Sequence, residues 1–556
     1  MPTDLRGLGV SAGVAAGAVA RMGDPPAVPD TVRPDPDPDV ELDAARQALE
    51  TVAASLDRRA ARADRQAAGV LTAQALMARD PALARTVEVA IRDGAAAVTA
   101  VADAFGAYRA TLAAAGGYMA DRVADLDDVC HRTVAVLLGV PMPGVPDPGH
   151  PYVLVAHDLA PADTTSLDAG TVLAVVTETG GPTSHTAILA KALGVPAVVA
   201  CPEASRLGDG DQVLVDGSTG AVTLDPSEPA VRRALADHEA SRDAHEQAAG
   251  PGRTADGHPV PLLVNLGGAA DLVGLDAVAA VEAEGVGLFR TEFLYLDRAD
   301  APSHAEQVEA YRRVFTAFAG RRVVVRTLDA GADKPLPFVT GPDEANPALG
   351  VRGLRTARRH PDLLAVQLAA LAEAAKGSGA DVEVMAPMVA TPGEAAGFVA
   401  QAHDAGLPTA GVMVEIPAAA LRARHVVAAC DFVSLGTNDL AQYTYAADRS
   451  EGLLAELLDA WQPAVLELVR LTAEAGTGAG TPVGVCGEAA SDPMLALVLV
   501  GLGVTSLSMT PRSVPSVRTA LGLHSLAECR GLASRALEAR DGRDGRTAVG
   551  AAAARA

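Results

Sequence analysis

One histidine of this 556-residue chain stands where a strand-like run gives way to a helix-like run. His185 ends the segment Gly-Gly-Pro-Thr-Ser-His (180–185); residues 171–177 are apolar and β-branched, and residues 186–193 favour a short helix closed by glycine. Free amide groups at a helix start attract anions such as phosphate. A neutral imidazole there can accept a phosphoryl group, although a histidine in a polar turn is more often a cap or a solvated side chain. The pattern indicates either a phosphoryl-transfer site or a simple helix cap.

A second group of reactive side chains ends the strand-like runs of the second half. Its members are Arg290, Arg326, Glu415, Asn438, Asp439 and Cys486. Arginine forks match phosphate oxygens, and two carboxylates together with substrate oxygens commonly hold Mg²⁺. A cysteine near cations can donate or accept a proton, although a small buried cysteine is the commoner case. The group predicts a site for an anion held partly by arginine and partly through a divalent cation.

Eight strand-like runs with helix-like segments between them must position this second group. The runs cover residues 261–265, 285–292, 323–329, 382–388, 412–417, 432–439, 483–488 and 506–510. Eight strand–helix units over roughly 250 residues predict a (β/α)₈ TIM barrel, in which the chemistry lies at the carboxyl ends of the strands.

The region that carries the histidine run is a separate α/β region. A buried strand is predicted over residues 7–20, and further strands over 152–156, 172–177, 197–200 and 212–215. Between them, residues 41–140 have a helical pattern, with Leu42, Leu49, Val52 and Leu56 on one stripe, which predicts a small helical bundle. Residues 229–247 are charged and suit a helical linker, and the Ala/Gly/Arg-rich tail from Asp541 is predicted to be disordered. The fold class is therefore a multidomain α/β protein.

Composition limits the range of partners. The formal net charge of −24 argues against nucleic acid or an anionic membrane as a main partner. The five cysteines show no metal-finger spacing and suit a reducing cytoplasm. No uncharged apolar run is long enough to insert through a bilayer.

The segments around these residues resemble one enzyme family. Residues 180–197 are similar to the phosphohistidine signature of phosphoenolpyruvate-utilising enzymes. The barrel segments resemble those of enzyme I of the bacterial sugar phosphotransferase system; they are residues 285–294, 326–329, 333–334, 346–352, 415–420, 436–444 and 486–488. The resemblance extends over about residues 5–525, with departures at Pro182, Lys191 and Ala332 that remove no catalytic group.

The resemblance implies a role for each matching residue. His185 is the residue that is phosphorylated on Nε2, Thr164 orients it, and Cys486 protonates enolpyruvate. Glu415 and Asp439 match ligands of Mg²⁺. The substrate-binding positions are Arg290, Arg326, Lys334, Arg352, Asn438, Asp439 and Arg449.

The resemblance also implies a domain order and partners. A phosphohistidine domain (1–24 and 146–228) contains a helical insertion (25–145) that docks the phosphocarrier protein HPr; a helical linker (229–257), a phosphoenolpyruvate-binding barrel (258–540) and the tail (541–556) follow. The implied activity is phosphoryl transfer from phosphoenolpyruvate to His185 and then to HPr, with release of pyruvate. A homodimer formed through the barrel is also implied.

Two other functions share some of these motifs. An enzyme like pyruvate phosphate dikinase or phosphoenolpyruvate synthase would share both modules but needs a nucleotide-binding module, whereas the region before His185 is largely helical and has no phosphate loop. A non-catalytic phosphoenolpyruvate-sensing scaffold would not need the proton donor Cys486.

Overall fold

A computed structural model gives the structure of the chain. It describes all residues except 1–2, 24–25, 30–31, 62–64, 116–122, 141–142, 147, 160–166, 168–169, 182–184, 248, 269–270, 273, 297, 332–335, 340–343, 345, 450–451 and 554–556. The chain forms two compact units, one of residues 1–238 with 449–455 and one of residues 239–448 with 456–556, and each is described by itself.

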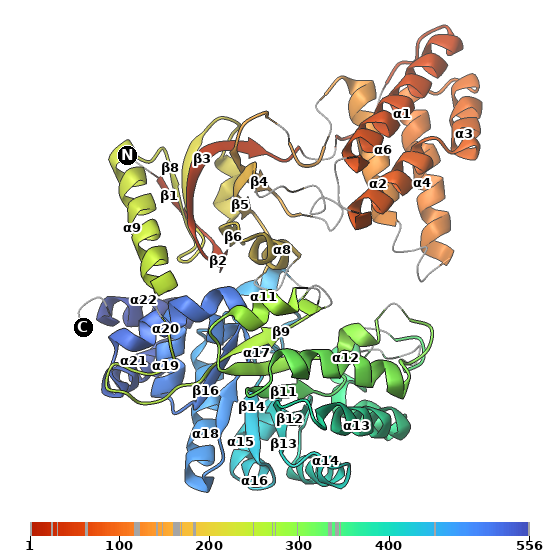
Figure 1. Cartoon of the computed structure of the whole chain (residues 1–556). Helices are drawn as coiled ribbons and strands as arrows, with labels where there is room; N and C mark the ends of the chain where they lie inside the picture. The colour runs from red at the N-terminus through yellow and green to blue at the C-terminus, as the bar shows by residue number, and fades with distance from the viewer. Residues whose placement is uncertain are drawn as a thin grey trace. The chain divides into compact units, whose positions relative to one another are not determined.

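The first unit contains a mixed sheet (Figure 1). Its strands are β1 (Thr3–Arg6), β2 (Leu8–Ser11), β3 (Val14–Arg21), β4 (Tyr152–Ala156), β5 (Val172–Thr177), β6 (Ala197–Val199), β7 (Gln212–Asp216) and β8 (Ala221–Leu224), in the order β1-β8-β7-β3-β4-β5-β6-β2. The β3, β4, β5 and β6 strands run parallel to one another. Helix α8 (His185–Leu193) follows β5, so the predicted strand-to-helix passage at the histidine run is confirmed.

The prediction of one buried strand over residues 7–20 was wrong. The chain turns at Gly13, whose φ of +133° suits glycine, and this turn separates β2 from β3. β2 pairs with β6 at the edge of the sheet, whereas β3 lies between β7 and β4. A Cβ atom on Gly13 would come within 2.8 Å of the Pro196 ring, so the turn also requires a residue that has no side chain.

A helical segment interrupts this sheet in sequence, as predicted. Its described helices are α1 (Pro38–Ala60), α2 (Arg65–Ala78), α3 (Pro81–Arg92), α4 (Ala97–Ala115) and α6 (Val123–Leu138). The predicted stripe of α1 is buried in a core of Leu, Val and Ala side chains. Asp37 and Asp80 cap α1 and α3 with their carboxylates, and a proline follows each cap. The short η1 (Pro202–Arg206) and the helix α9 (Glu228–Gln247) lie later in the chain, so the linker is helical as predicted.

The second unit is built on a closed barrel of eight described strands. They are β9 (Leu262–Leu266), β10 (Gly285–Arg290), β11 (Arg322–Arg326), β12 (Asp381–Ala386), β13 (Ala410–Val414), β14 (Phe432–Leu435), β15 (Val483–Val485) and β16 (Ser506–Met509). Every neighbouring pair is parallel, and β16 closes on β9. All eight predicted strands are confirmed, and several end earlier than predicted because their last polar residues belong to the following loops.

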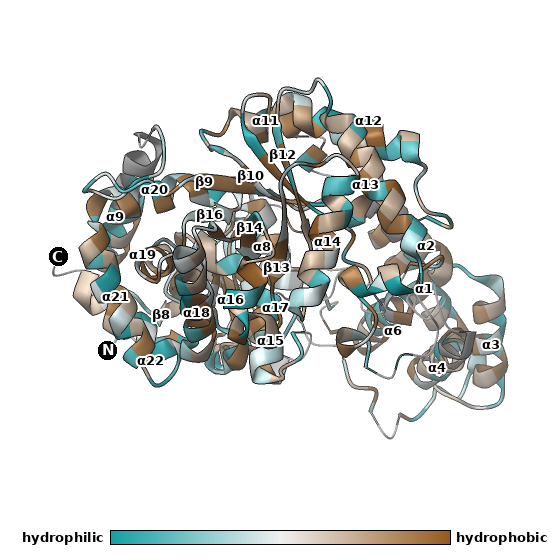
Figure 2. Ribbon diagram, turned by 90° about the horizontal axis from the view of Figure 1, so that it is seen from below, coloured by the Kyte–Doolittle hydropathy of each residue, from teal (hydrophilic) through white to brown (hydrophobic). Residues whose placement is uncertain are grey.

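The barrel strands β9 and β13 are strongly apolar, and helices cover the outside of the barrel (Figure 2). They are α11 (Leu275–Ala280), α12 (His304–Ala317), α13 (Pro361–Ala375), α14 (Pro392–Asp404), α15 (Pro417–Leu421), α16 (Ala423–Val427), α17 (Thr437–Tyr445), α18 (Pro463–Ala479), α19 (Pro493–Gly501), α20 (Val514–Leu523), α21 (Leu526–Glu538) and α22 (Gly542–Ala553). Short 3₁₀ turns are η2 (Glu292–Leu294), η3 (Pro347–Leu349), η4 (Gly353–Arg358), η5 (Gly452–Leu458), η6 (Glu488–Ser491) and η7 (Pro511–Ser513). None of the helices in the described part of the chain combines the length and apolar character needed to cross a membrane.

The prediction of a disordered tail from Asp541 was wrong for residues 542–553, which form α22. Gly542, Gly545 and Val549 are buried on one face of this helix. Arg546 on the same helix pairs with Asp459. Tertiary packing and this ion pair therefore stabilise a helix that its Gly/Ala-rich composition does not predict.

Candidate functional site

The reactive side chains predicted in the barrel gather at one end of it. Arg290 and Arg326 are the last residues of β10 and β11. Glu415 and Cys486 directly follow β13 and β15, and Asp439 lies in the first turn of α17, after β14. Because the strands are parallel, these positions share the carboxyl end of the barrel, where TIM barrels place their active sites.

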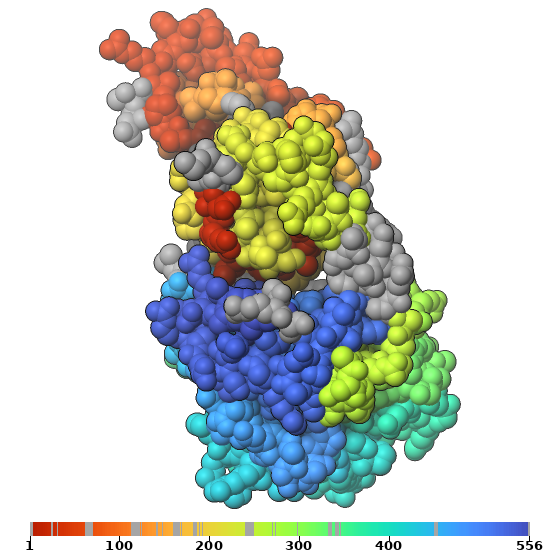
Figure 3. Space-filling view, turned by 90° about the vertical axis from the view of Figure 1, so that its left-hand side faces the viewer, coloured from red at the N-terminus to blue at the C-terminus, as the bar shows by residue number. Residues whose placement is uncertain are grey.

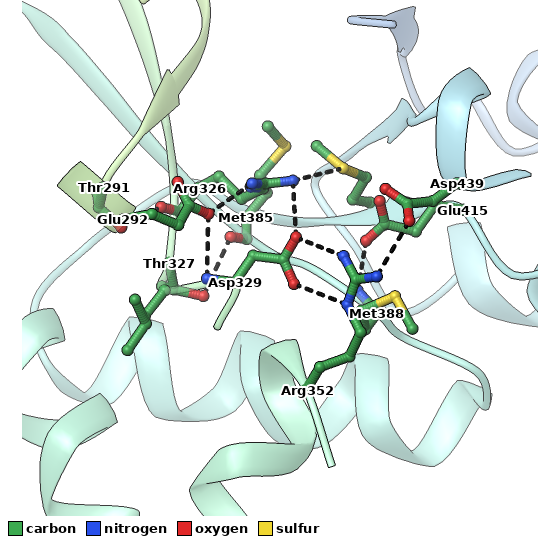
Figure 4. A network of polar contacts seen from close by, with 12 residues as sticks. Thr291, Glu292, Arg326, Thr327, Asp329, Arg352, Met385, Met388, Glu415 and Asp439 are labelled. Atoms are coloured by element: carbon green, nitrogen blue, oxygen red, sulfur yellow. Dashed lines mark hydrogen bonds and ion pairs between the residues drawn. The ribbon is translucent and has the colours of Figure 1, made fainter. Parts of the chain in front are cut away.

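Arg326 lies at the centre of a buried ionic network (Figure 4). Its Nη2 lies 2.5 Å from Oε1 of Glu292, and its Nη1 lies 3.2 Å from Oδ2 of Asp329. Burial acts to lower the pKa of Arg326, but the carboxylates of Glu292, Asp329 and Glu415 outweigh it and raise that pKa above the ordinary value. The side chain is therefore a permanent cation inside the barrel mouth.

Arg352 extends this network to α17 (Figure 4). Its Nη2 donates to Oδ2 of Asp329 at 3.0 Å, and its Nη1 donates to Oδ1 of Asp439 at 3.2 Å and to the Tyr443 hydroxyl at 3.3 Å. The arginine is 1% exposed. Asp329 thus bridges two arginines, and Arg352 fixes the orientation of Asp439.

Glu415 and Asp439 bring two carboxylates together beside this network (Figure 4). Oε1 of Glu415 accepts a hydrogen bond from the backbone N–H of Met388 at 2.6 Å. Burial raises the pKa of Glu415, and the charges of Asp439 and Asp329 raise it further. A Cβ atom on Gly436 would lie 2.8 Å from Oε2 of Glu415, so glycine keeps space beside this oxygen. The pair concentrates negative charge in a place where a cation would be stabilised.

Cys486 is a buried thiol next to these groups. It is 3% exposed, and its Sγ donates to the Leu435 carbonyl oxygen at 3.6 Å. Burial raises the pKa of this thiol, which keeps its proton at neutral pH. Asn438 accepts a hydrogen bond from the backbone N–H of Glu488 at 3.2 Å and so ties α17 to the segment that follows Cys486. A thiol that holds its proton is suited to act as an acid.

Three buried donors at the carboxyl end of the barrel have no hydrogen-bond partner among the described residues. They are Nε of Arg290, Nε of Arg326 and Oγ1 of Thr437. A buried N–H or O–H without a partner costs about 1–3 kcal/mol, so such groups call for a ligand. Arginine donors favour an anion.

The turn that carries His185 belongs to the first unit and is anchored mainly through its backbone. Thr179 donates its N–H to the His157 carbonyl oxygen at 3.0 Å and accepts from the N–H of Ala200 at 3.1 Å. Glu178 pairs with Arg21 at 2.6 Å and with Nδ1 of His157 at 3.2 Å. His185 is the first residue of α8, where backbone N–H groups have no intrahelical partner. The position suits an anionic group on or near the imidazole.

Three predicted site residues stand apart from this geometry. Thr164 and Lys334 lie outside the described residues. Arg449 lies four residues beyond the end of α17, after the left-handed residue Ala446 with φ of +51°. Their predicted roles stay predictions.

Comparisons with known proteins assign both units to one family. Three family models match: "PEP-utilising enzyme, N-terminal" over residues 6–122, "PEP-utilising enzyme, mobile domain" over 148–220, and "PEP-utilising enzyme, PEP-binding domain" over 241–525. A phosphoenolpyruvate-protein phosphotransferase of Streptomyces coelicolor is 57% identical over 99% of each chain. One of Haloferax volcanii is 42% identical over 87% of this chain and 86% of its own.

The chain belongs to the enzyme I family of phosphoenolpyruvate-protein phosphotransferases. It is an enzyme that transfers phosphoryl groups from phosphoenolpyruvate. A multiphosphoryl transfer protein of Xanthomonas campestris is also similar, 39% identical over 96% of this chain and 65% of its own length. The barrel that was predicted to bind phosphoenolpyruvate is the part matched by the PEP-binding model.

The sequence alone predicted no role for two carboxylates that organise the barrel site. Glu292 and Asp329 hold Arg326, and Asp329 also holds Arg352. Each stands two or three residues after an arginine at a strand end, in the segments Arg-Thr-Glu and Arg-Thr-Leu-Asp. This spacing was the available signal, but the second partner of Asp329 lies 23 residues away in the sequence.

The carboxylates at the barrel mouth supply only part of a binding site for a divalent cation. In the described part of the chain no three His, Cys, Asp or Glu side chains are grouped to hold a metal ion. The charge of Asp439 nevertheless adds to the burial that raises the pKa of Glu415, so negative charge is concentrated at this place. Mg²⁺ prefers such oxygen ligands and is often held by two carboxylates together with phosphate oxygens of a substrate.

Proposed function

We propose that this protein transfers the phosphoryl group of phosphoenolpyruvate to Nε2 of its own His185 and then to the phosphocarrier protein HPr, and releases pyruvate. The observation that carries the proposal is the pair Arg290 and Arg326, whose buried Nε donors lack partners at the barrel mouth. They lie beside a protonated thiol, which binding of an anion alone would not require. The position of His185 at a helix start supplies the acceptor.

The barrel residues would divide the work of substrate binding. Arg290 and Arg326 would hold the phosphate and carboxylate groups, because their guanidinium forks match both. Arg352 would add positive charge while it orients Asp439, to which it donates. The remaining binding positions of the proposal are Asn438, Asp439, Arg449 and Lys334. Bound Mg²⁺ would be held by Glu415 and Asp439 and would neutralise charge on the phosphoryl oxygens.

The chemistry needs one nucleophile and one acid. Nε2 of His185 attacks phosphorus in line, a bond from nitrogen to phosphorus forms, and the bond from phosphorus to the enol oxygen breaks. The electron pair of the broken bond leaves with enolpyruvate as an enolate. The Sγ–H of Cys486 then gives its proton to the methylene carbon, which yields pyruvate and a thiolate that is reprotonated from solvent. Thr164 would orient the imidazole for the attack.

The proposal assigns each partner to one region of the chain. His185 must reach the barrel mouth for the first transfer and leave it for the second, in which HPr takes the phosphoryl group. The helical insertion at residues 25–145 would dock HPr, and the barrel would pair with a second copy as a homodimer. A cytoplasmic location agrees with the five free cysteines.

A labelling experiment tests the route. Protein incubated with phosphoenolpyruvate labelled in its phosphoryl group and with Mg²⁺, without nucleotide, should become labelled with acid-labile, base-stable phosphate. Added HPr should then take up the label within one turnover. Exposed His150 offers a matched control in the first unit, since His150→Ala should label like the natural protein.

Three outcomes would contradict different parts of the proposal. A need for nucleotide would favour a dikinase-like route. Label that forms on the protein but never passes to HPr would remove HPr as the acceptor. Binding of phosphoenolpyruvate without any label would favour a sensing scaffold.

A further inference from the structure

The C-terminal helix α22 approaches the catalytic end of the barrel closely. A Cβ atom on Gly542, the first residue of α22, would lie 3.1 Å from Oδ2 of Asp459 and 3.3 Å from the backbone nitrogen of Gln462, so a side chain at this position would crowd both atoms. Helices α20–α22 occupy one face of the barrel unit, in dark blue in Figure 3. The α22 helix lies beyond residues 241–525, which the PEP-binding model matches.

Arg546 on α22 joins two loops of the barrel. Its Nη2 donates to Oδ1 of Asp459 at 3.3 Å, and its Nη1 donates to Oδ2 of Asp492 at 3.2 Å. The guanidinium also lies over the ring of Trp461, 5.3 Å from the ring centroid. Asp459 precedes α18 and Asp492 precedes α19, so one side chain bridges two consecutive strand-to-helix connections at the carboxyl end of the barrel.

The contact of Arg546 with Asp492 fixes the segment that follows Cys486. Asp492 accepts from the Trp461 indole N–H at 2.8 Å through Oδ2, and through Oδ1 it caps α19 at the N–H groups of Met494 and Leu495. At the other end of the same segment, Glu488 donates its N–H to Asn438. The connection between Cys486 and α19 is therefore held at both ends.

The contact of Arg546 with Asp459 reaches the helix that carries Asp439. Trp461 is 1% exposed and donates its backbone N–H to Asp459 at 3.1 Å. The next residue, Gln462, accepts a hydrogen bond from the hydroxyl of Tyr445 at 3.1 Å. Tyr445 is the last residue of α17, and Asp439 lies in the first turn of the same helix. Polar contacts thus connect Arg546 to both ends of α17.

We propose that Arg546 is a positioning residue for phosphoryl transfer. By bridging Asp459 and Asp492 around Trp461, it keeps the segments that carry Cys486 and Asp439 in a fixed position relative to each other. This inference rests on the proposed roles of those two residues. Arg290 and Arg326 lie on β10 and β11, away from the bridged connections, so loss of Arg546 should slow the reaction more than it weakens substrate binding.

The test uses the full chain and its single tryptophan. Arg546→Met keeps an apolar stem but removes both ionic contacts, Arg546→Lys keeps one charge, and Arg543→Met is the matched control on the exposed side of α22. We expect the single-turnover rate of pyruvate release to fall about tenfold in Arg546→Met, with the half-saturating phosphoenolpyruvate concentration changed by less than about twofold. Arg546→Lys should recover part of the rate. Emission of Trp461 should change in Arg546→Met and stay unchanged in Arg543→Met.

Each outcome bears on the proposal. A normal rate in Arg546→Met with altered Trp461 emission would overturn it, because the bridge would then pack the tryptophan without positioning the site. A rate loss that follows only the unfolded fraction, measured by thermal melting, would overturn it as well. Natural protein that transfers no phosphoryl group to His185 would overturn the proposed function and this inference together, whereas an active natural protein with an unaffected variant overturns this inference alone.

Discussion

The barrel mouth and the turn that carries His185 hold their reactive groups in different ways. At the barrel mouth, Arg326 and Arg352 are buried and linked by Asp329, so the charged side chains fix one another. At the histidine turn, the described anchoring consists mainly of hydrogen bonds between Thr179 and the backbone of His157 and Ala200. The contrast fits a division in which one unit binds a small anion in a preorganised site and the other presents an acceptor.

The largest expected effect distinguishes the role of His185 in phosphoryl transfer from the role of the barrel mouth in substrate binding. His185→Ala should lower incorporation of labelled phosphoryl groups at least about a thousandfold, because the nucleophile is lost. Binding of phosphoenolpyruvate to the barrel, measured by calorimetry in the presence of Mg²⁺, should change by less than about twofold. Label retained in the variant would show that another residue is the acceptor.

The next effect tests how strongly the barrel mouth depends on its ionic links. Arg352→Met leaves Asp329 without one of its two arginines in a buried place, and removal of one partner of a buried pair costs about 3–5 kcal/mol. Urea unfolding followed by Trp461 fluorescence should report this loss.

The control for that variant lies on the same unit. Arg358→Met breaks a surface pair with Glu394 in which the arginine side chain is 71% exposed, and it should cost less than about 1 kcal/mol. Equal losses of unfolding free energy in the two variants would mean that the buried network stabilises the barrel no more than a surface ion pair does.

A smaller effect is expected at the histidine turn. Glu178→Gln removes the carboxylate that pairs with Arg21, and the first unit should lose about 1–2 kcal/mol of unfolding free energy. Glu228→Gln, which removes an exposed pair with Arg232 in α9, should be neutral. Because Trp461 lies in the second unit, both losses are measured by hydrogen exchange of the backbone amides of the first unit in urea. A loss at Glu178 as large as that at Arg352 would remove the contrast between the two regions.

The smallest effect concerns the pH dependence of Cys486. An ordinary thiol has a pKa of about 8.5, and burial raises the pKa of Cys486 above its ordinary value. The proton-bearing form therefore persists as pH rises, and the rate of pyruvate formation should change by less than about twofold between about pH 7.5 and 9. A decline centred near pH 8.5 that is absent in Cys486→Ala would contradict a buried, protonated thiol.

Much of the barrel could be predicted because most of its strands are short apolar runs that end in polar residues or are followed by them. Arg290, Arg326, Glu415 and Cys486 all follow this rule, and the parallel topology alone brings such residues together. The contact between Arg352 and Asp439 could not be predicted, because it joins residues 87 positions apart through side chains alone.

The two errors of the sequence analysis have local causes. The division of residues 7–20 depends on one glycine with positive φ, which an apolar pattern does not reveal. The α22 helix looks disordered from composition because Gly542 and Gly545 have low helix propensity. Gly542 instead allows close packing against Asp459 and Gln462, which is visible only in three dimensions.

The central claim is that His185 and the barrel mouth act in one reaction. It is tested most directly by counting pyruvate released and phosphoryl groups bound in a single turnover with excess enzyme, and by mapping the modified residue by mass spectrometry. The account predicts one phosphoryl group on His185 for each pyruvate. Pyruvate released without phosphorylation of His185 would contradict it.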